Sequence, residues 1–208
     1  MAYPEITGPY GFKPVNLVGG QYVTGAFRQI PIASGYSTDI FNGDMVDLTT
    51  TGTLVKNSTG TATATTVGIF IGCAYTDPNL KYFIQKQYYP EDTAASDIVG
   101  YVVDDPNQLF KVAVVSATTV ISYLTRAAVG LNATIVQNVG STDTGNSKNA
   151  IDDTVASTAS LPLRVIDVVP ETSYEVNTSG TTYETRYREV ICKWNLGTHR
   201  YQNATGVT

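Results

Sequence analysis

The amino-acid sequence predicts an all-β protein: an antiparallel β-barrel or β-sandwich with an extended irregular N-terminal arm and one short helix. The first observation behind this prediction is composition. The 208 residues include 30 Thr, 23 Val and 14 Tyr, types that suit the pleated, half-buried surface of a strand. The second is spacing, because short apolar runs recur between clusters of Gly, Asn, Asp and Pro. This pattern is typical of sandwiches and barrels.

The first 27 residues differ from the rest of the chain. Gly and Pro are so frequent there that no long element can form, yet the residues between them are apolar or aromatic. We expect residues 1–27 to form an arm that packs either over its own barrel or on a neighbouring subunit. The candidate interface residues of this arm are Tyr3, Tyr10, Phe12, Val15, Leu17, Val18 and Tyr22.

The next part of the chain is predicted to be a succession of strands. Turn signals separate them: Asn42-Gly43 tolerates positive φ, and Thr51-Gly52 suits a hairpin. The run 67–75 is apolar throughout, which predicts burial on both of its faces. The expected strands lie at 29–33, 45–48, 53–56, 67–75, 81–89, 98–103 and 109–115.

Aromatic residues gather in the expected strand at 81–89. Tyr88 and Tyr89 are candidate interface residues, since aromatic side chains anchor protein interfaces and also stack on sugars. Packing inside the barrel or at its rim is the alternative interpretation of the same residues. The sequence leaves these possibilities open.

The second half contains the one helix that the sequence predicts, at 116–128. Val120, Tyr123 and Leu124 would share its apolar face, and Gly130 would end it. Strands are expected to resume at 131–136, 161–169 and 185–194, with a polar excursion at 138–150. We therefore expect one β-rich domain over 28–202 and a frayed tail at 203–208, with a division of the domain into two lobes near 116–130 as the alternative.

Charge and hydropathy exclude several classes of protein. Only 15% of the residues are charged, against about 25% in ordinary domains. The 13 Lys and Arg against 18 Asp and Glu leave no basic surface for nucleic acid. No apolar run approaches the ~20 residues of a membrane-spanning helix, so no membrane partner is expected. The start of the chain carries neither a basic region nor an apolar one, so no secretory signal is expected.

Residues suited to catalysis or metal binding are few. The single His, His199, lies near the C-terminus, where we expect it to be exposed to solvent. Cys73 and Cys192 fall in apolar strands and are expected to be buried free thiols, with a disulfide as the alternative. Paired acids at 91–92, 104–105 and 152–153 suit turn caps better than calcium binding or glycoside hydrolysis. We expect no enzyme activity, cofactor or metal site.

Several segments of the chain resemble a known family. The runs IASGYSTDIFNGDMVDLTTTGTLVKN, VGIFIGCAYTDP, QYYP and VGYVVDDPNQLF are similar to those of capsid decoration (cement) proteins of tailed bacteriophages. With GPYGFKPVNLVGGQ and TGNSKNAID, the resemblance covers residues 8–195. It implies a homo-oligomer, a trimer being favoured, that is made in the host cytoplasm and sits on the capsid surface of the virion against the major capsid protein.

Composition and resemblance lead to the same hypothesis. A chain poor in charge, with no catalytic set and with an apolar arm, suits a virion structural protein that decorates or cements the outer face of a capsid. The alternative is a tail- or fibre-associated virion protein that recognises a host glycan through exposed Tyr side chains.

Overall fold

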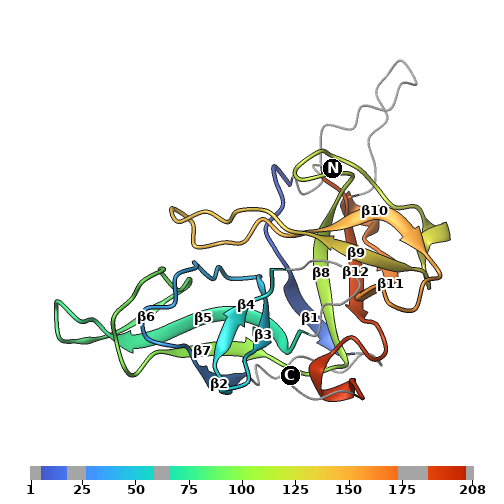
Figure 1. Ribbon diagram of the computed structural model, residues 1–208. Coiled ribbons are helices and arrows are strands. Elements are labelled where there is room, and N and C mark those ends of the chain that lie inside the picture. The colour runs from blue at the N-terminus through green and yellow to red at the C-terminus, as the bar shows by residue number, and fades with distance from the viewer. Residues whose placement is uncertain (1–5, 18–26, 59–65, 173–186, 205–208) are drawn as a thin grey trace.

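The computed structural model describes residues 6–17, 27–58, 66–172 and 187–204. It is nearly all β, which confirms the expected fold class. The described strands form two six-stranded sheets that lie side by side (Figure 1). Three short 3-10 helices complete the described secondary structure: η1 (Arg126–Ala128), η2 (Pro170–Thr172) and η3 (Arg200–Gln202).

The first sheet, called the barrel here, has the strand order β1-β8-β10-β9-β11-β12, and a further pairing of β12 with β8 closes it. Five strands thus form a closed ring, and β1 is attached outside this ring along β8. Strand β10 runs parallel to β8, and the other pairs are antiparallel. The strands are β1 (Lys13–Leu17), β8 (Gln108–Val115), β9 (Asn132–Val136), β10 (Ala150–Ala156), β11 (Leu163–Val168) and β12 (Glu189–Trp194).

The second sheet has the order β2-β7-β5-β3-β4, with β6 paired to the end of β5. A parallel bridge between Ile32 and Leu54 draws the two ends of this sheet together. Strand β5 is buried along most of its length, as its continuous apolar run predicts. The strands are β2 (Arg28–Pro31), β3 (Met45–Leu48), β4 (Leu54–Lys56), β5 (Gly68–Thr76), β6 (Phe83–Lys86) and β7 (Val99–Val103).

Turns form where the dipeptide signals predict them. The amide of Asp44 donates to the carbonyl of Phe41 at 2.9 Å across Asn42-Gly43, and Gly43 has φ +94°. Gly52 has φ +77° in the turn that joins β3 to β4. The chain passes from the second sheet to the barrel at residues 104–107, before the segment 116–130 where a division was expected.

The core is continuous between the two sheets. In the barrel, the ring of Phe110 meets Phe12 and Trp194 edge-on, with centroids 6.4 and 5.5 Å apart. Met45 and Ile69 of the second sheet belong to the same buried cluster. A separate cluster fills the second sheet around Phe70 and Tyr89. The sheets therefore share apolar contacts where they meet.

The structure corrects the prediction of a helix at 116–128. Only its last three residues are helical, as the 3-10 helix η1, and the rest forms turns with Thr118 at φ +42°. Val120 is 55% exposed and Tyr123 is 41% exposed, so of the supposed apolar face only Leu124 packs against the core. The β-branched residues of this stretch lose rotamer freedom in a helix, and the partial burial of one side chain does not offset that loss.

The described part of the arm packs on its own barrel. Strand β1 pairs antiparallel with β8, placing Lys13 opposite Lys111 and Pro14 opposite Phe110. Residues 1–5 and 18–26 of the arm lie outside the described residues, as do 205–208 of the expected tail. For residues 6–17, docking within the same chain is the arrangement that the structure shows.

Candidate interaction surfaces

The structure divides the predicted interface residues into three groups. Phe12 and Tyr89 are 0% exposed and belong to the core of the chain, the alternative that the sequence left open for them. Tyr10, Val15 and Tyr88 are half-buried. The remaining residues of the prediction fall outside the described side chains: Tyr3, Leu17, Val18 and Tyr22.

The half-buried tyrosines make contacts within the chain. The hydroxyl of Tyr10 donates to the Glu189 carboxylate, and burial raises the pKa of that hydroxyl above its usual value. The ring of Tyr88 stacks on Phe41, with centroids 5.5 Å apart and planes at 17°. These rings are therefore committed to internal packing on at least one side.

A buried polar network joins the second sheet to the excursion between β9 and β10. The Asp44 carboxylate is 0% exposed, and its Oδ2 accepts from the Phe41 amide at 2.9 Å and lies 2.9 Å from the Lys56 ammonium. Its Oδ1 accepts from the Ser147 hydroxyl at 2.6 Å and from the Asn149 amide group at 3.1 Å. One carboxylate thus holds two segments a hundred residues apart in sequence.

The arm reaches the same junction through a close backbone contact. The Gly11 amide donates to the Asn149 carbonyl at 3.2 Å, and the Phe12 amide donates to the Gly43 carbonyl at 3.0 Å. Gly11 has φ +81°, and a Cβ there would lie 2.6 Å from the Cβ of Ser147. The fit therefore requires glycine, and it fixes the position of β1.

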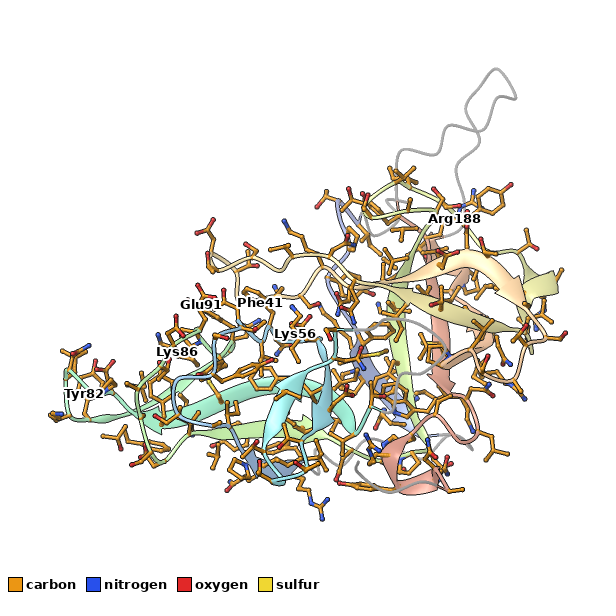
Figure 2. All side chains as sticks on the ribbon, viewed as in Figure 1. Phe41, Lys56, Tyr82, Lys86, Glu91 and Arg188 are labelled. Atoms are coloured by element: carbon orange, nitrogen blue, oxygen red, sulfur yellow. The ribbon has the colours of Figure 1, made fainter. Side chains whose placement is uncertain are left out.

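The loop between β5 and β6 presents large apolar side chains to solvent. Leu80, Tyr82 and Phe83 are 60%, 55% and 61% exposed. With Lys81 they form what we call the hairpin tip, residues 80–83. Figure 2 shows Tyr82 at the far end of the second sheet, away from the barrel.

The hairpin tip has a defined conformation. Oδ1 of Asp77 accepts from the amides of Asn79 and Leu80 at 2.8 and 2.9 Å, and these bonds hold the pKa of Asp77 below its usual value. At its base, the Thr76 hydroxyl donates to Asp97 at 2.6 Å. The apolar side chains are therefore displayed by an ordered turn.

A second surface is a pocket of about 360 Å³ between the excursion and the second sheet, called the loop pocket here. Val139 is 85% exposed beside it, and the carboxylates of Asp39 and Glu91 line it. Oδ1 of Asp39 accepts from the Glu91 amide at 2.8 Å, which sets the two acids together. The lining residues are Thr38, Asp39, Phe41, Lys56, Glu91, Gln137, Asn138 and Val139.

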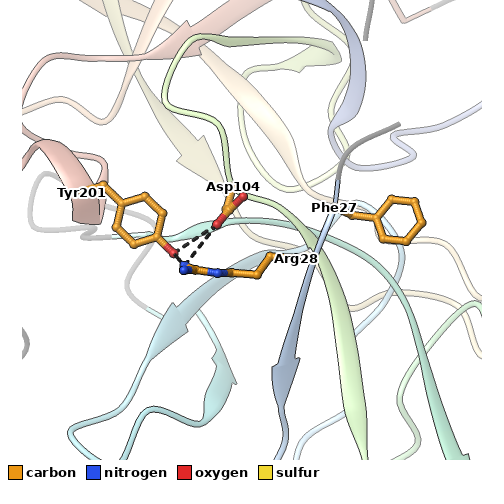
Figure 3. Close-up of a pocket in the computed structure, with 4 residues that line it drawn as sticks. All are labelled: Phe27, Arg28, Asp104 and Tyr201. Atoms are coloured by element: carbon orange, nitrogen blue, oxygen red, sulfur yellow. Dashed lines mark hydrogen bonds and ion pairs between the residues drawn. The ribbon is translucent and has the colours of Figure 1, made fainter. Parts of the chain in front are cut away.

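A third surface, called the Arg28 pocket here, lies where β2 meets the C-terminal segment and has a volume of about 530 Å³. Figure 3 shows the Tyr201 hydroxyl and the Arg28 guanidinium meeting at the Asp104 carboxylate, while the Phe27 ring lies on the other side of the strand and points away from them. The Tyr201 hydroxyl donates to Oδ2 of Asp104 at 3.1 Å, and Arg28 lies 3.4 Å from the same oxygen.

The ring of His199 packs edge-on against Tyr201 of this pocket, and its burial corrects the prediction from the sequence. It was expected in solvent, yet it is 0% exposed. The C-terminal segment folds back, so that the Arg200 amide donates to the Thr66 carbonyl at 2.9 Å. Nδ1 of His199 accepts from the Tyr201 amide at 3.2 Å, and burial lowers the pKa of the imidazole.

Both thiols are buried and free, as predicted. Burial raises the pKa of Cys73 to about 12 and also raises that of Cys192. A thiol held in its protonated form is a poor nucleophile. Within the described ranges, no cluster of three or more His, Cys, Asp or Glu side chains could hold a metal ion. Nor does any helix in the described part of the chain have the length and apolarity to cross a bilayer.

The sequence did not identify Leu80 of the hairpin tip or the loop pocket as candidate interaction surfaces. The signal for the hairpin tip was present, since Leu80 and the aromatic residues Tyr82 and Phe83 directly follow the Asp77-Pro78-Asn79 turn. The pocket had no local signal, because its walls come from distant segments. Comparison of the chain with protein-family models, with curated proteins and with solved structures finds no match.

Proposed function

We propose that this chain is a virion structural protein that binds the major capsid protein on the outer surface of a tailed-phage head and stabilises the shell. The observation that carries this proposal is the group of large apolar side chains exposed together at the hairpin tip. Leu80 is 60% exposed, Tyr82 is 55% exposed and Phe83 is 61% exposed. Neighbouring apolar side chains exposed in this way mark sites of protein interaction.

The placement of the reactive groups favours a binding role over catalysis. His199, Cys73 and Cys192 are each 0% exposed. A nucleophile or general base must reach its substrate, at hydrogen-bond distance or through one water. These three side chains are closed off by the core, so they serve packing.

A low charge suits repeated burial of the surface. Only 15% of the residues are charged, so covering a face removes few ions from water and carries a small desolvation cost. The Asp44 network and the shared core keep the two sheets in one arrangement. A rigid body of this kind loses little conformational entropy on binding.

The physical mechanism is mass action. A protein that binds the assembled shell and not its dissociated subunits shifts the equilibrium toward the shell, by about 2.7 kcal/mol per site at a free concentration of 100 Kd. Many symmetry-related copies repeat this contribution over the whole particle.

The test is cosedimentation of the purified chain with undecorated shells, together with thermal melting of those shells. We expect saturable binding and a higher melting temperature of the shell. Shells that already carry the unlabelled chain are the control and should take up no labelled chain. Binding that does not saturate, or a shell whose melting temperature stays constant at full occupancy, would contradict the proposal.

A glycan-binding virion protein is the second candidate, and the Arg28 pocket favours it. Aromatic faces beside a carboxylate and a guanidinium are the groups that sugars engage. Phe27 is 50% exposed and Tyr201 is 45% exposed, whereas Tyr89 is buried and cannot stack on a ligand. Binding on a glycan array that Phe27→Ala abolishes would support this candidate, and a silent array would count against it.

A further inference from the structure

We propose that the hairpin tip of one copy docks in the loop pocket of a second copy of this chain. The inference deepens the proposed function and rests on it, because that role involves oligomeric contacts. It identifies the surfaces that would make those contacts. Each chain carries both surfaces, and the two complement each other in shape, apolar surface and charge.

The hairpin tip is a preorganised apolar projection. Leu80, Tyr82 and Phe83 are each more than half exposed, and the Asp77 cap and the pairing of β5 with β6 fix their backbone. Among the described strands, β6 pairs with β5 alone, so the hairpin stands at an edge of the sheet. A projection that is already ordered loses little entropy when a partner binds it.

The loop pocket has the size and lining to receive such a projection. Its volume of about 360 Å³ lies at the lower end of the range ~300–1,000 Å³ for pockets that enclose small organic groups. Val139 provides its exposed apolar lining, whereas Phe41 is only 3% exposed. A Cβ at Gly140 would lie 2.2 Å from the Phe41 ring, so the excursion rests directly on that ring. An aromatic side chain of the tip can pack against Val139 there.

The charges of the two surfaces are complementary. Lys81 is the cation of the hairpin tip, and Asp39 and Glu91 are the acids of the pocket. The ammonium of Lys56 also lines the pocket, but it lies 2.9 Å from the buried carboxylate of Asp44 and is neutralised there. No other unpaired cation among the lining residues therefore competes with an incoming Lys81 for Asp39 and Glu91. Such complementarity favours this register over others.

The tip and the pocket are separate places on the chain. Figure 2 shows Tyr82 at the outer end of the second sheet, while Phe41, Lys56 and Glu91 lie nearer the barrel. The contact is therefore heterologous: each copy offers its tip to one neighbour and its pocket to another. Repeated heterologous contacts close into a ring when the rotation allows it. A cyclic trimer is one such ring.

The first experiment measures the molar mass of the purified full-length chain by light scattering during gel filtration. We expect a concentration-dependent oligomer. Tyr82→Ser removes the apolar tip and Val139→Asp places a charge beside the pocket, and each should raise the dissociation constant by about tenfold or more. Leu196→Ser removes an equally exposed side chain elsewhere and should leave the mass unchanged. Circular dichroism confirms that each variant is folded.

Mixing the two variants tests the head-to-tail arrangement. The Tyr82→Ser chain keeps its pocket and the Val139→Asp chain keeps its tip, so one intact junction can form between them. We expect a dimer in the mixture where each variant alone is a monomer. A mixture that stays monomeric would show that the two surfaces do not meet and would overturn the proposal.

Charge reversal tests the register. Lys81→Glu and Glu91→Lys each bring like charges together and should weaken association, whereas the double variant restores an opposite pair and should recover it. A double variant no better than the single ones would overturn the pairing of Lys81 with Glu91. A wild-type chain that is monomeric at every concentration would overturn the inference itself. The cosedimentation experiment decides shell binding separately, so the two failures can be distinguished.

Discussion

The ammonium nitrogen of Lys56 lies 2.9 Å from Oδ2 of Asp44, whose side chain is completely buried. A buried charge is costly unless opposite charge and hydrogen bonds surround it. Both carboxylate oxygens of Asp44 are satisfied, by partners from the second sheet and from the excursion. The pair is therefore the electrostatic centre of the junction between the two sheets.

Asp44→Ala should lower the free energy of unfolding by about 3–5 kcal/mol, because it leaves the half-buried Lys56 without its counter-ion. Urea denaturation followed by tryptophan fluorescence measures this change. Asp143→Ala is the matched control: it removes an exposed carboxylate from the same excursion and should change stability by less than about 0.5 kcal/mol. Equal effects of the two substitutions would contradict the importance of the network.

Gly11→Ala should destabilise the protein more than Gly52→Ala. Both glycines have nearly the same φ, +81° and +77°. A Cβ at Gly52 meets nothing within 4 Å, whereas one at Gly11 would clash with Ser147 and Gly43. Gly52→Ala should cost only the left-handed strain of about 1–2 kcal/mol. The difference between the two unfolding free energies isolates the close approach, and a zero difference would show that the arm yields freely.

Phe12→Ala should lower the free energy of unfolding by about 3–5 kcal/mol, since Phe12 is 0% exposed against Phe110 in the barrel. The measurement is urea denaturation at a concentration where the chain is monomeric. Tyr82→Ser serves as the control, because it removes an exposed aromatic ring. If Phe12→Ala changed oligomerisation and left unfolding unaffected, the arm would be an intersubunit element after all.

His199 should make stability depend on pH below neutrality. Burial lowers the pKa of its imidazole, so the unfolded chain binds a proton more readily than the folded chain does. Its contribution is therefore complete above the unfolded pKa of about 6.5 and is lost as the pH falls below that value. Protonation at Nδ1 would also break the bond from the Tyr201 amide.

The test compares wild type with His199→Gln between pH 7.5 and pH 5, chosen to bracket a pKa of about 6.5. Wild type should lose up to about 1.4 kcal/mol more than the variant for each pH unit below the unfolded pKa. Parallel stability curves would mean that the imidazole protonates without cost in the folded state.

Local patterns predicted the local structure of this chain well. The tight turn at Asn42-Gly43 and the buried strand β5 follow from φ preference and from a continuous apolar run, both of which act over a few residues. The prediction of a helix at 116–128 was wrong because a local pattern does not show what packs against it. Its apolar spacing was correct, but Val120 and Tyr123 stay 55% and 41% exposed, and tertiary burial is what stabilises most helices.

Long-range structure could not be predicted in this way. Asp44 meets Ser147 and Asn149 across about a hundred residues, and no periodicity connects them. His199 was expected in solvent because it lies near the chain end, yet the fold-back of η3 closes it in. Of the candidate surfaces, the hairpin tip could be found in the sequence, whereas the loop pocket exists only once residues 38–41, β4 and the excursion come together.

The pairing of β1 and β12 with β8 constrains the order in which the chain can fold during synthesis. The second sheet is built from the contiguous residues 28–103, so it can form while the ribosome is still translating the rest. The barrel must wait, because its closing strand β12 ends at Trp194. Until that strand emerges, β8 keeps an unpaired edge, the kind of intermediate that aggregates. Expression at low temperature, which slows aggregation relative to closure, should therefore raise the yield of folded chain.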